Sequence, residues 1–228
     1  MSSKLPSIDL EANSAIQNQG ERLSISRFAL FFLPCLIGVV ADLGTKFYMF
    51  ANYFDPNRAD SSSPEYAPQF PHWWLDGIFG IQTSTNPGAL FGMGGGYSSV
   101  FAVFSVVALV GILVWLFWLG AAHDRWLTFS LGLISGGILG NLYDRIGLGY
   151  DPSFPVEIKN NVRDWILFRL EGVPFFDPWP NFNIADVCLV CGAIMLFVHA
   201  FLYAEPVSAE PASAESDELI ENSQPTVD

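Results

Sequence analysis

Carboxylate and carboxamide side chains lie at the ends of two long apolar runs of the sequence. One run ends in Asn141 and Asp144, and another begins just after Asn183, with Asp186 near its start. Two antiparallel membrane helices would bring these groups to one depth, near one interface. Two close carboxylates can hydrolyse a peptide bond, because one takes a proton from water while the other protonates or polarises the carbonyl. Since like charges cannot both ionise at close range, such a pair holds a single proton.

The sequence offers no competing set of catalytic residues. His72, His123 and His199 are scattered, and His123 falls on the side opposite the acids. Cys188 and Cys191 form a C-x-x-C, but thiols inside an apolar helix behave as small apolar side chains. We therefore expect neither a bound metal nor a cofactor.

A further polar interruption lies in the first apolar run. Asp42 and Lys46 are four residues apart, so on a helix they share one face and can form an ion pair. Charged groups within a span are costly and are usually paired or functional. The structural interpretation is an ion pair near the outer interface, with the Lys46 ammonium reaching toward water.

The elements that must position these groups are membrane spans. The chain of 228 residues is 51% hydrophobic and 15% aromatic, which favours a membrane protein over a soluble one. A helix of about 20 residues crosses the hydrocarbon core, and four runs approach that length. The expected spans are about 28–50, 97–119, 126–143 and 184–203. A tight turn joins the second and third spans, so these two helices must be antiparallel neighbours.

The two ends of the chain have a different composition. The formal net charge is -13, and residues 205–228 hold seven acids and no base. The segment 204–228 is thus expected to be a disordered acidic tail, since it cannot bury enough apolar surface to fold. Residues 1–24 are polar and are expected to form an N-terminal tail. Residues 25–203 form the predicted membrane domain.

Basic residues in short flanks predict the orientation. Arg22 and Arg27 precede the first span, and Arg125 lies between the second and third, so both termini are expected in the cytoplasm. The loop between the third and fourth spans conflicts with this rule, because it carries several bases. These are Arg145, Lys159, Arg163 and Arg169. The conflict weakens if several of them have functional roles.

The segment from His72 to Asn86 has alternating, β-compatible residues bounded by Gly and Asn clusters. It predicts a small sheet at the outer surface, where Trp73 and Trp74 suit the membrane interface. The predicted fold is therefore an all-α membrane protein with four transmembrane helices, a small extracytoplasmic β platform and outer loop or helix insertions.

Five motifs in this order resemble the lipoprotein signal peptidase (signal peptidase II) family. They are D-x-x-T-K at 42–46, N-x-G-x-x-F at 86–91, G-G-x-x-G-N-x-x-D-R at 136–145, D-W-I at 164–166 and F-N-x-A-D at 182–186. The third and fifth are quite specific together, and the resemblance spans about residues 25–203. It implies that Asp164 and Asp186 are the catalytic pair. It also implies supporting or substrate-contacting roles for Asn86, Gly88, Asn141, Arg145, Asn183, Asp42 and Lys46.

One departure from the family pattern concerns the first catalytic acid. That acid normally follows the D-R pair by a short stretch, whereas here eighteen residues separate Arg145 from Asp164. Asp151 lies nearer the usual spacing. We favour Asp164, because Trp165 and Ile166 resemble the pair that follows the family's acid, and because Asp151 precedes proline, which is typical of a turn.

The resemblance implies a membrane aspartyl endopeptidase that removes the signal peptide from diacylglyceryl-modified prolipoproteins, cutting before the lipidated cysteine. Its partners would be that substrate and membrane lipid, with no nucleic acid, and the chain would act as a monomer. It would lie in the bacterial inner membrane, with both termini cytoplasmic and the active site near the outer face.

Two other classes of function remain open from the sequence. A small ion or solute carrier also uses intramembrane acids, but it predicts polar residues along the span interiors, and the second and fourth spans are mainly apolar. A non-catalytic membrane scaffold would follow if Asp164 and Asp186 were distant. Cleavage of the first span as a lipoprotein signal is disfavoured, since Cys35 follows Phe-Leu-Pro rather than small residues.

Overall fold

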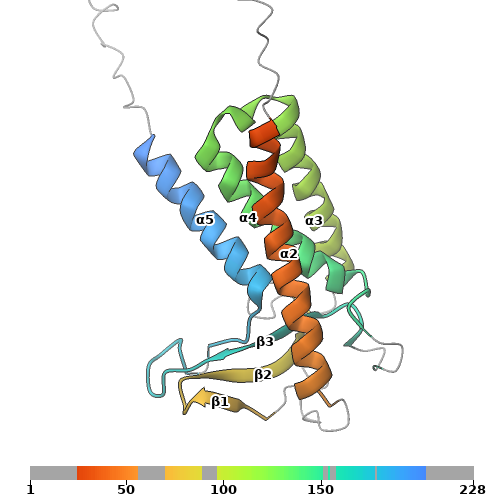
Figure 1. The fold of residues 1–228 in the computed structure, drawn as a ribbon. Coiled ribbons are helices and arrows are strands. Elements are labelled where there is room, and N and C mark those ends of the chain that lie inside the picture. The colour runs from red at the N-terminus through yellow and green to blue at the C-terminus, as the bar shows by residue number, and fades with distance from the viewer. Residues whose placement is uncertain are drawn as a thin grey trace, which may run out of the picture.

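The computed structural model describes residues 25–55, 70–88, 97–150, 154, 158–177 and 179–203. Four helical segments run side by side, and a small sheet lies across one end of them (Figure 1). The helices are α2 (Ile25–Tyr53), α3 (Ser98–Leu113) continued by the π-helical turn η3 (Val114–Trp118), α4 (Arg125–Arg145) and α5 (Ile184–Leu202). A short 3-10 turn, η4 (Ala121–His123), precedes α4. The predicted tails, 1–24 and 204–228, lie outside the described residues.

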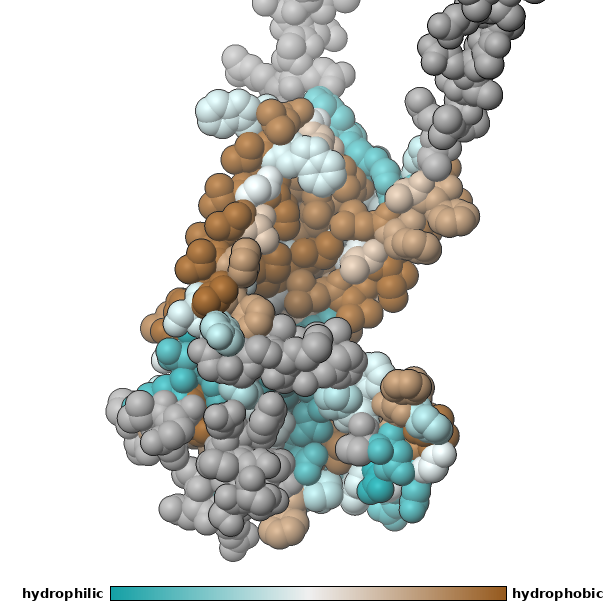
Figure 2. Space-filling model, turned by 180° about the vertical axis from the view of Figure 1, so that it is seen from behind, coloured by the Kyte–Doolittle hydropathy of each residue, from teal (hydrophilic) through white to brown (hydrophobic). Residues whose placement is uncertain are grey.

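Three helices among the described residues are long and apolar enough to cross a membrane. They are Ile25–Tyr53, Ser98–Trp118 and Ile184–Leu202. Their outward faces carry large apolar side chains, most of all α3, in which Ala102 is the buried residue. Figure 2 shows this apolar surface as a broad belt above the more hydrophilic sheet end. The structure thus confirms three of the predicted spans by length and composition.

The remaining predicted span, 126–143, forms α4, but its composition is different. This helix contains Gly, Ser, Thr and Asn residues that face its neighbours rather than the outside. It packs most extensively against α2 and α5. A Cβ atom on Gly132 would lie 2.5 Å from the carbonyl oxygen of Phe31, so only glycine allows this approach to α2. The helix is therefore the centre of the bundle and needs little apolar surface.

The sheet has three antiparallel strands in the order β1 (His72–Leu75), β2 (Phe79–Asn86) and β3 (Val162–Phe168). Ser84 pairs with Asp164, and Asn86 pairs with Val162. Side chains of paired residues point to the same face of a sheet. The end of β2 and the start of β3 therefore present Asn86 and Asp164 on one face.

An apolar cluster joins the sheet to the end of α2. Its buried members are Met49 and Phe50 from α2, Ile81 from β2, and Trp165 and Ile166 from β3. Because Trp165 and Ile166 directly follow Asp164, this packing holds the backbone that carries the acid. The cluster fixes the sheet against the bundle at the level of the site.

The prediction of a small sheet is confirmed for β1 and β2, but the prediction lacked the third strand. This third strand, β3, contains the D-W-I motif, for which the sequence analysis predicted no strand. Between α4 and β3, the described residues 146–150 form turns rather than an inserted helix. Asp151 lies outside the described residues.

Candidate active site

A short pairing between β3 and the chain before α5 sets the positions of the two proposed acids. The N–H of Ile166 donates to the carbonyl of Phe182 at 2.9 Å, and the N–H of Phe182 donates back at 3.2 Å. Asp164 stands two residues before this bridge, and Asp186 stands four residues after it, in the first turn of α5. Residues far apart in the sequence are thereby fixed relative to each other.

Asn183 contacts both carboxyl groups. Its side-chain amide donates to Asp164 Oδ1 at 2.6 Å, and its backbone N–H donates to Asp186 Oδ2 at 3.1 Å. Asn183 is also the N-cap of α5, since its Oδ1 accepts from the N–H of Asp186 at 3.0 Å. The two residues form a capping box, so the motif that starts the helix also orients one acid.

Asn141 of α4 orients Asp186 from the other side. Its Nδ2 donates to Asp186 Oδ1 at 2.9 Å, while its Oδ1 accepts from Lys46 Nζ at 2.9 Å and from Asn183 Nδ2 at 3.1 Å. The amide oxygen thus faces two donors and the amide nitrogen faces the carboxylate. Asp186 therefore has both oxygens engaged by amide donors.

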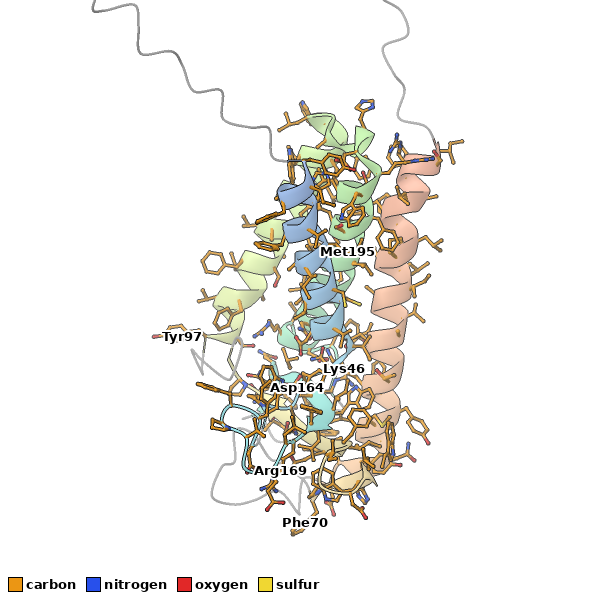
Figure 3. All side chains as sticks on the ribbon, turned by 90° about the vertical axis from the view of Figure 1, so that its left-hand side faces the viewer. Lys46, Phe70, Tyr97, Asp164, Arg169 and Met195 are labelled. Atoms are coloured by element: carbon orange, nitrogen blue, oxygen red, sulfur yellow. The ribbon has the colours of Figure 1, made fainter. Side chains whose placement is uncertain are left out.

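Asp164 is buried, with 2% of its surface exposed. Burial raises the pKa of the Asp164 carboxyl well above its ordinary value, and the nearby charge of Asp186 raises it further. Lys46 and hydrogen bonds from Asn183 and Asn86 act in the opposite direction but do not offset the burial. Figure 3 shows Asp164 and Lys46 at the same end of the bundle, where the helices meet the sheet. Protonated Asp164 is therefore favoured beside Asp186.

The end of β2 supplies two further groups. Asn86 Oδ1 accepts from the N–H of Gly88 at 3.0 Å, which leaves its amide nitrogen to donate to Asp164. The carbonyl of Gly88 accepts from Arg145 Nη2 at 2.9 Å. The Arg145 guanidinium lies over the ring of Phe101, 5.0 Å from its centre, and its buried Nη1 has no hydrogen-bond partner among the described residues.

These groups line a cavity of about 470 Å³. One part of its wall is polar and consists of Asn86, Asn141, Arg145, Asp164, Asn181 and Asp186. The other part is apolar and includes Trp179, Pro180, Phe182, Val187, Leu189 and Val190. The cavity therefore joins two carboxyl groups to an apolar surface along the first turns of α5.

Asp42 and Lys46 form the predicted ion pair, with 2.8 Å between Lys46 Nζ and Asp42 Oδ2. The expectation that Lys46 reaches toward water was wrong, because both side chains are fully buried. Lys46 instead contacts Asp144 Oδ2 at 3.1 Å as well as Asn141. Asp42 Oδ1 accepts from the N–H of Ala185 at 2.9 Å, so α2 caps the start of α5.

Arg163 was missed by the sequence reasoning, which counted it only as a loop base. It is 1% exposed, and its Nε and Nη2 each lie 2.8 Å from Asp144 Oδ1. The backbone N–H of Arg163 also donates to Asp144 Oδ2 at 3.1 Å. Its guanidinium lies 4.6 Å from the ring centre of Phe47. The sequence signal that could have identified its role was the β-compatible run 162–168. Adjacent side chains of a strand point to opposite faces, so such a run places Arg163 and Asp164 in different surroundings.

All seven of the predicted supporting residues lie at this end of the bundle, in the cavity wall or in the contacts just described. Within the described residues, no group of three or more His, Cys, Asp or Glu side chains is arranged to hold a metal ion. The arrangement can hold a proton on Asp164 beside the charge of Asp186, next to an arginine whose Nη1 has no hydrogen-bond partner among the described residues.

Comparison with known proteins identifies the family. The family model described as Signal peptidase (SPase) II matches residues 35–202. A lipoprotein signal peptidase of Rhodopirellula baltica is 44% identical over 184 residues, covering 81% of this chain and 77% of that protein. A lipoprotein signal peptidase of Pseudomonas syringae pv. tomato is 34% identical over 182 residues, covering 78% of this chain and 88% of that protein.

A solved structure of a bacterial membrane enzyme has the same fold, with a TM-score of 0.58 and 22% identity. The similarity covers 78% of this chain and 91% of that one. Together with the membrane-length helices, this makes the chain an integral membrane protein. Because the family model matches most of its length and two relatives are similar over most of theirs, the chain belongs to the signal peptidase II family.

Proposed function

We propose that this protein is an aspartyl endopeptidase that removes signal peptides from prolipoproteins, with Asp164 and Asp186 as its catalytic pair. The observation that carries this proposal is the sharing of Asn183 between the two carboxyl groups, in a cavity that also has an apolar wall. The names of the similar proteins from Rhodopirellula baltica and Pseudomonas syringae support the substrate class. Membership of the family supports peptidase activity.

The environments of the two acids favour different roles. Asp164, with its raised pKa, holds the proton, while Asp186 lies at the N-terminus of α5, where the helix dipole favours negative charge. In the proposed reaction, Asp186 takes a proton from water as the water oxygen attacks the scissile carbonyl carbon. Asp164 donates its proton to the carbonyl oxygen. Collapse of this gem-diol intermediate breaks the C–N bond, as Asp186 gives its proton to the leaving amine and Asp164 takes a proton back from a hydroxyl of the intermediate.

Arg145 is the group best placed to bind the substrate backbone. The amides of Asn86, Asn141 and Asn183 donate to the two acids, so they are less available to bind an oxyanion. Nη1 of Arg145, by contrast, has no hydrogen-bond partner among the described residues and belongs to a residue of the cavity wall. We propose that it donates to a carbonyl of the substrate near the cleaved bond.

The apolar wall along α5 suits a lipid-modified substrate. Val187 and Val190 continue the cavity from Asp186 along a helix whose outer surface is apolar. Acyl chains on a diacylglyceryl cysteine could lie there while the peptide bond before that cysteine reaches the acids. The proposed cut is therefore just before the lipidated cysteine. Because one chain supplies every group of the site, we propose that the protein acts as a monomer.

We further propose that α4 is a fourth span. Its 21 residues extend for about 30 Å, and its packing between α2 and α5 removes the need for lipid-facing apolar residues. In Figure 1, α2 begins and α5 ends at the end of the bundle opposite the sheet. With Arg27 and Arg125 at that end, we propose an inner-membrane protein with both termini in the cytoplasm and the site near the outer face.

Site-directed variants test the catalytic pair. Asp164→Asn and Asp186→Asn keep the side-chain volume but remove proton exchange, so each should lower kcat for a diacylglyceryl-modified prolipoprotein by roughly a thousandfold or more. Since the acids act as a unit, the double variant should be scarcely slower than either single variant. Asp151→Asn, and Asp76→Asn at the exposed β1–β2 turn, should retain substantial activity.

The outcomes of this experiment separate the alternatives. An inactive Asp151→Asn with an active Asp164→Asn would make Asp151 the first acid. Normal cleavage by all variants would refute the aspartyl mechanism. Absence of any cleavage by the wild-type chain, in a well-folded preparation with a lipid-modified substrate, would favour a scaffold.

A further inference from the structure

A second recess lies at the end of the bundle away from the acids. It has a volume of about 610 Å³ and is formed where α2 begins, α4 begins and α5 ends. Arg27, Asp124 and Arg125 line its polar part, and Phe129 and Met195 line its apolar part. Figure 3 shows Met195 on α5, well separated from Asp164 of β3 and nearer the end of the bundle that holds this recess. The proposed peptidase mechanism makes no use of these groups.

Among the described residues that line the recess, the one carboxylate is that of Asp124, and it is already engaged within the protein. Asp124 is the N-cap of α4, and its Oδ1 accepts from the N–H of Leu127 at 2.9 Å. Its Oδ2 lies 2.5 Å from Nε2 of His199 on α5. Oδ1 of Asp124 therefore caps α4, Oδ2 joins the start of α4 to the end of α5, and neither oxygen forms an ion pair with an arginine of the described residues.

The two arginines of the recess form no ion pair with any residue that the structure describes. Nη1 of Arg27 is buried and has no hydrogen-bond partner among the described residues. Arg125 is exposed, and neither arginine forms an ion pair within the described part of the chain. A guanidinium binds phosphate and carboxylate oxygens through two parallel hydrogen bonds. The recess therefore has unused capacity for an anion.

The order of groups in the recess matches that of a phospholipid. Phe129 lies one turn from Arg125 along α4, and Met195 lies two turns before Tyr203 along α5, so the apolar part is nearer the middle of the bundle. Trp126 and Tyr203, which also line the recess, are partly or largely exposed, as aromatic side chains are at a membrane interface. Trp126 is held in place because its Nε1 donates to the carbonyl of Met195 at 2.8 Å.

We propose that this recess binds one anionic phospholipid, with the phosphate between Arg27 and Arg125 and an acyl chain along Phe129 and Met195. Juxtamembrane cations attract anionic lipid in general. This site differs from a diffuse attraction because it combines the apolar part of the recess with a buried guanidinium donor that has no partner among the described residues. A free phosphodiester would use the arginines alone, whereas a neutral lipid would use the apolar part alone.

Native mass spectrometry of the purified full-length chain in detergent tests the proposal. Phosphatidylglycerol and phosphatidylcholine with identical acyl chains are titrated, and the wild-type chain should retain phosphatidylglycerol at a concentration at least tenfold lower. The double variant Arg27→Gln, Arg125→Gln should lose this preference. The variant Arg27→Lys, Arg125→Lys keeps both charges and should retain part of it, which separates binding from misfolding.

The matched control removes two charges at the other end of the bundle, through Lys159→Gln and Arg169→Gln. It should bind phosphatidylglycerol as the wild-type chain does, and the arginine variants should keep prolipoprotein cleavage. Equal retention of the two lipids by the wild-type chain would overturn the proposal. So would unchanged retention by the Arg27→Gln, Arg125→Gln variant, or equal competition by glycerophosphoglycerol, which carries the headgroup without acyl chains.

Discussion

Asn183 shows how one residue can start a helix and build a site. Its Oδ1 caps α5 through the N–H of Asp186, which leaves its amide nitrogen free to donate to Asp164. The residue types of the F-N-x-A-D motif therefore follow from geometry as well as chemistry. Asparagine is required as cap and donor, and aspartate at the third helical position completes the capping box.

The pH dependence of cleavage should report the raised pKa of Asp164. The shared proton is present below that pKa and is lost as the pH rises through it, so activity should fall on the alkaline side. The hydrogen bond from Asn86 lowers the pKa of Asp164. In Asn86→Ala the pKa should rise, and the alkaline limb of kcat/KM should move upward by on the order of one pH unit.

This shift is measured on purified protein by cleavage of a lipid-modified substrate across the pH range. Asn52→Ala removes an exposed asparagine that donates to the carbonyl of Tyr48 and does not contact the acids, so its profile should match that of the wild-type chain. A limb that moves to lower pH in Asn86→Ala would show that Asp164 does not hold the proton.

Arg163 should matter for the rate of cleavage more than for substrate binding. It does not line the cavity, but its guanidinium and its backbone N–H both bind Asp144, and Asp164 is the next residue. In Arg163→Met, Asp144 keeps Lys46 and the backbone N–H of residue 163 but loses the guanidinium, and removing one partner of a buried ion pair costs up to about 3–5 kcal/mol. We expect kcat to fall about tenfold or more with KM nearly unchanged.

Steady-state kinetics and thermal unfolding in detergent check this expectation together. Arg163→Lys keeps the charge but not the planar fork, and it should recover part of both the rate and the stability. If Arg163→Met unfolds at a lower temperature but retains the wild-type kcat, Arg163 has a structural role alone.

At the scale of elements, α4 organises the molecule although its sequence is the least apolar of the helices. Glycines on its surface face α2 and α5 at distances that admit no side chain. A Cβ on Gly136 would lie 2.8 Å from the carbonyl oxygen of Cys35, and one on Gly137 would lie 2.4 Å from that of Ala185. Since Asp186 follows Ala185, the packing of Gly137 bears directly on the site.

Gly137→Ala should therefore displace the start of α5. The contacting atom is a backbone oxygen, which cannot move without the helix, so we expect destabilisation of about 1–3 kcal/mol and a loss of activity. Gly111→Ala is the matched control, because a Cβ on Gly111 of α3 meets nothing within 4 Å. Thermal unfolding and cleavage are measured for both. Equal behaviour of the two variants would contradict the packing argument.

The strand β3 marks the limit of what the sequence could predict. The run 162–168 is β-compatible, but its partner β2 lies more than seventy residues earlier, and pairing over such a separation leaves no local signal. The motifs did identify Asp164 and Asp186 as candidates. Their shared contact with Asn183 could not be predicted, because it depends on the bridge between Ile166 and Phe182.

The burial of the charged residues Asp42 and Lys46 was a second feature that the sequence could not predict. The spacing of Asp42 and Lys46 correctly predicted an ion pair, but burial depends on Asp144 and Asn141, which come from another helix. A lysine near the end of a span is usually expected to reach water. Here three acceptors inside the protein replace water, which no local pattern could indicate.

At the scale of the whole molecule, the structure explains most of the basic residues that conflict with the predicted orientation in the membrane. Of the four bases in the loop before the last span, Arg163 is buried against Asp144, and Arg145 binds the carbonyl of Gly88 in the cavity wall. Arg169 forms an ion pair with Asp177 at 2.6 Å. These three bases are held by the fold, so they conflict less with an outer location than their number suggests.

The orientation is tested by fusing reporters to the two sides. If Arg27 and Arg125 lie at the cytoplasmic end, as we propose, a fluorescent protein fused after Glu205 should fold and fluoresce in the cytoplasm, while alkaline phosphatase at that position should be inactive. Reporters inserted within 61–63, between α2 and β1, should give the reverse pattern.

The same fusions test whether α4 spans the membrane. With four spans, the loop between α2 and β1 and the loop between α4 and α5 lie on one side, so phosphatase inserted after Glu171 should be active as it is within 61–63. If α4 did not cross, the loop after Glu171 would lie on the cytoplasmic side, and the sheet that joins β2 to β3 could not form in the membrane-inserted protein. Activity after Glu205 together with activity within 61–63 would contradict the four-span arrangement.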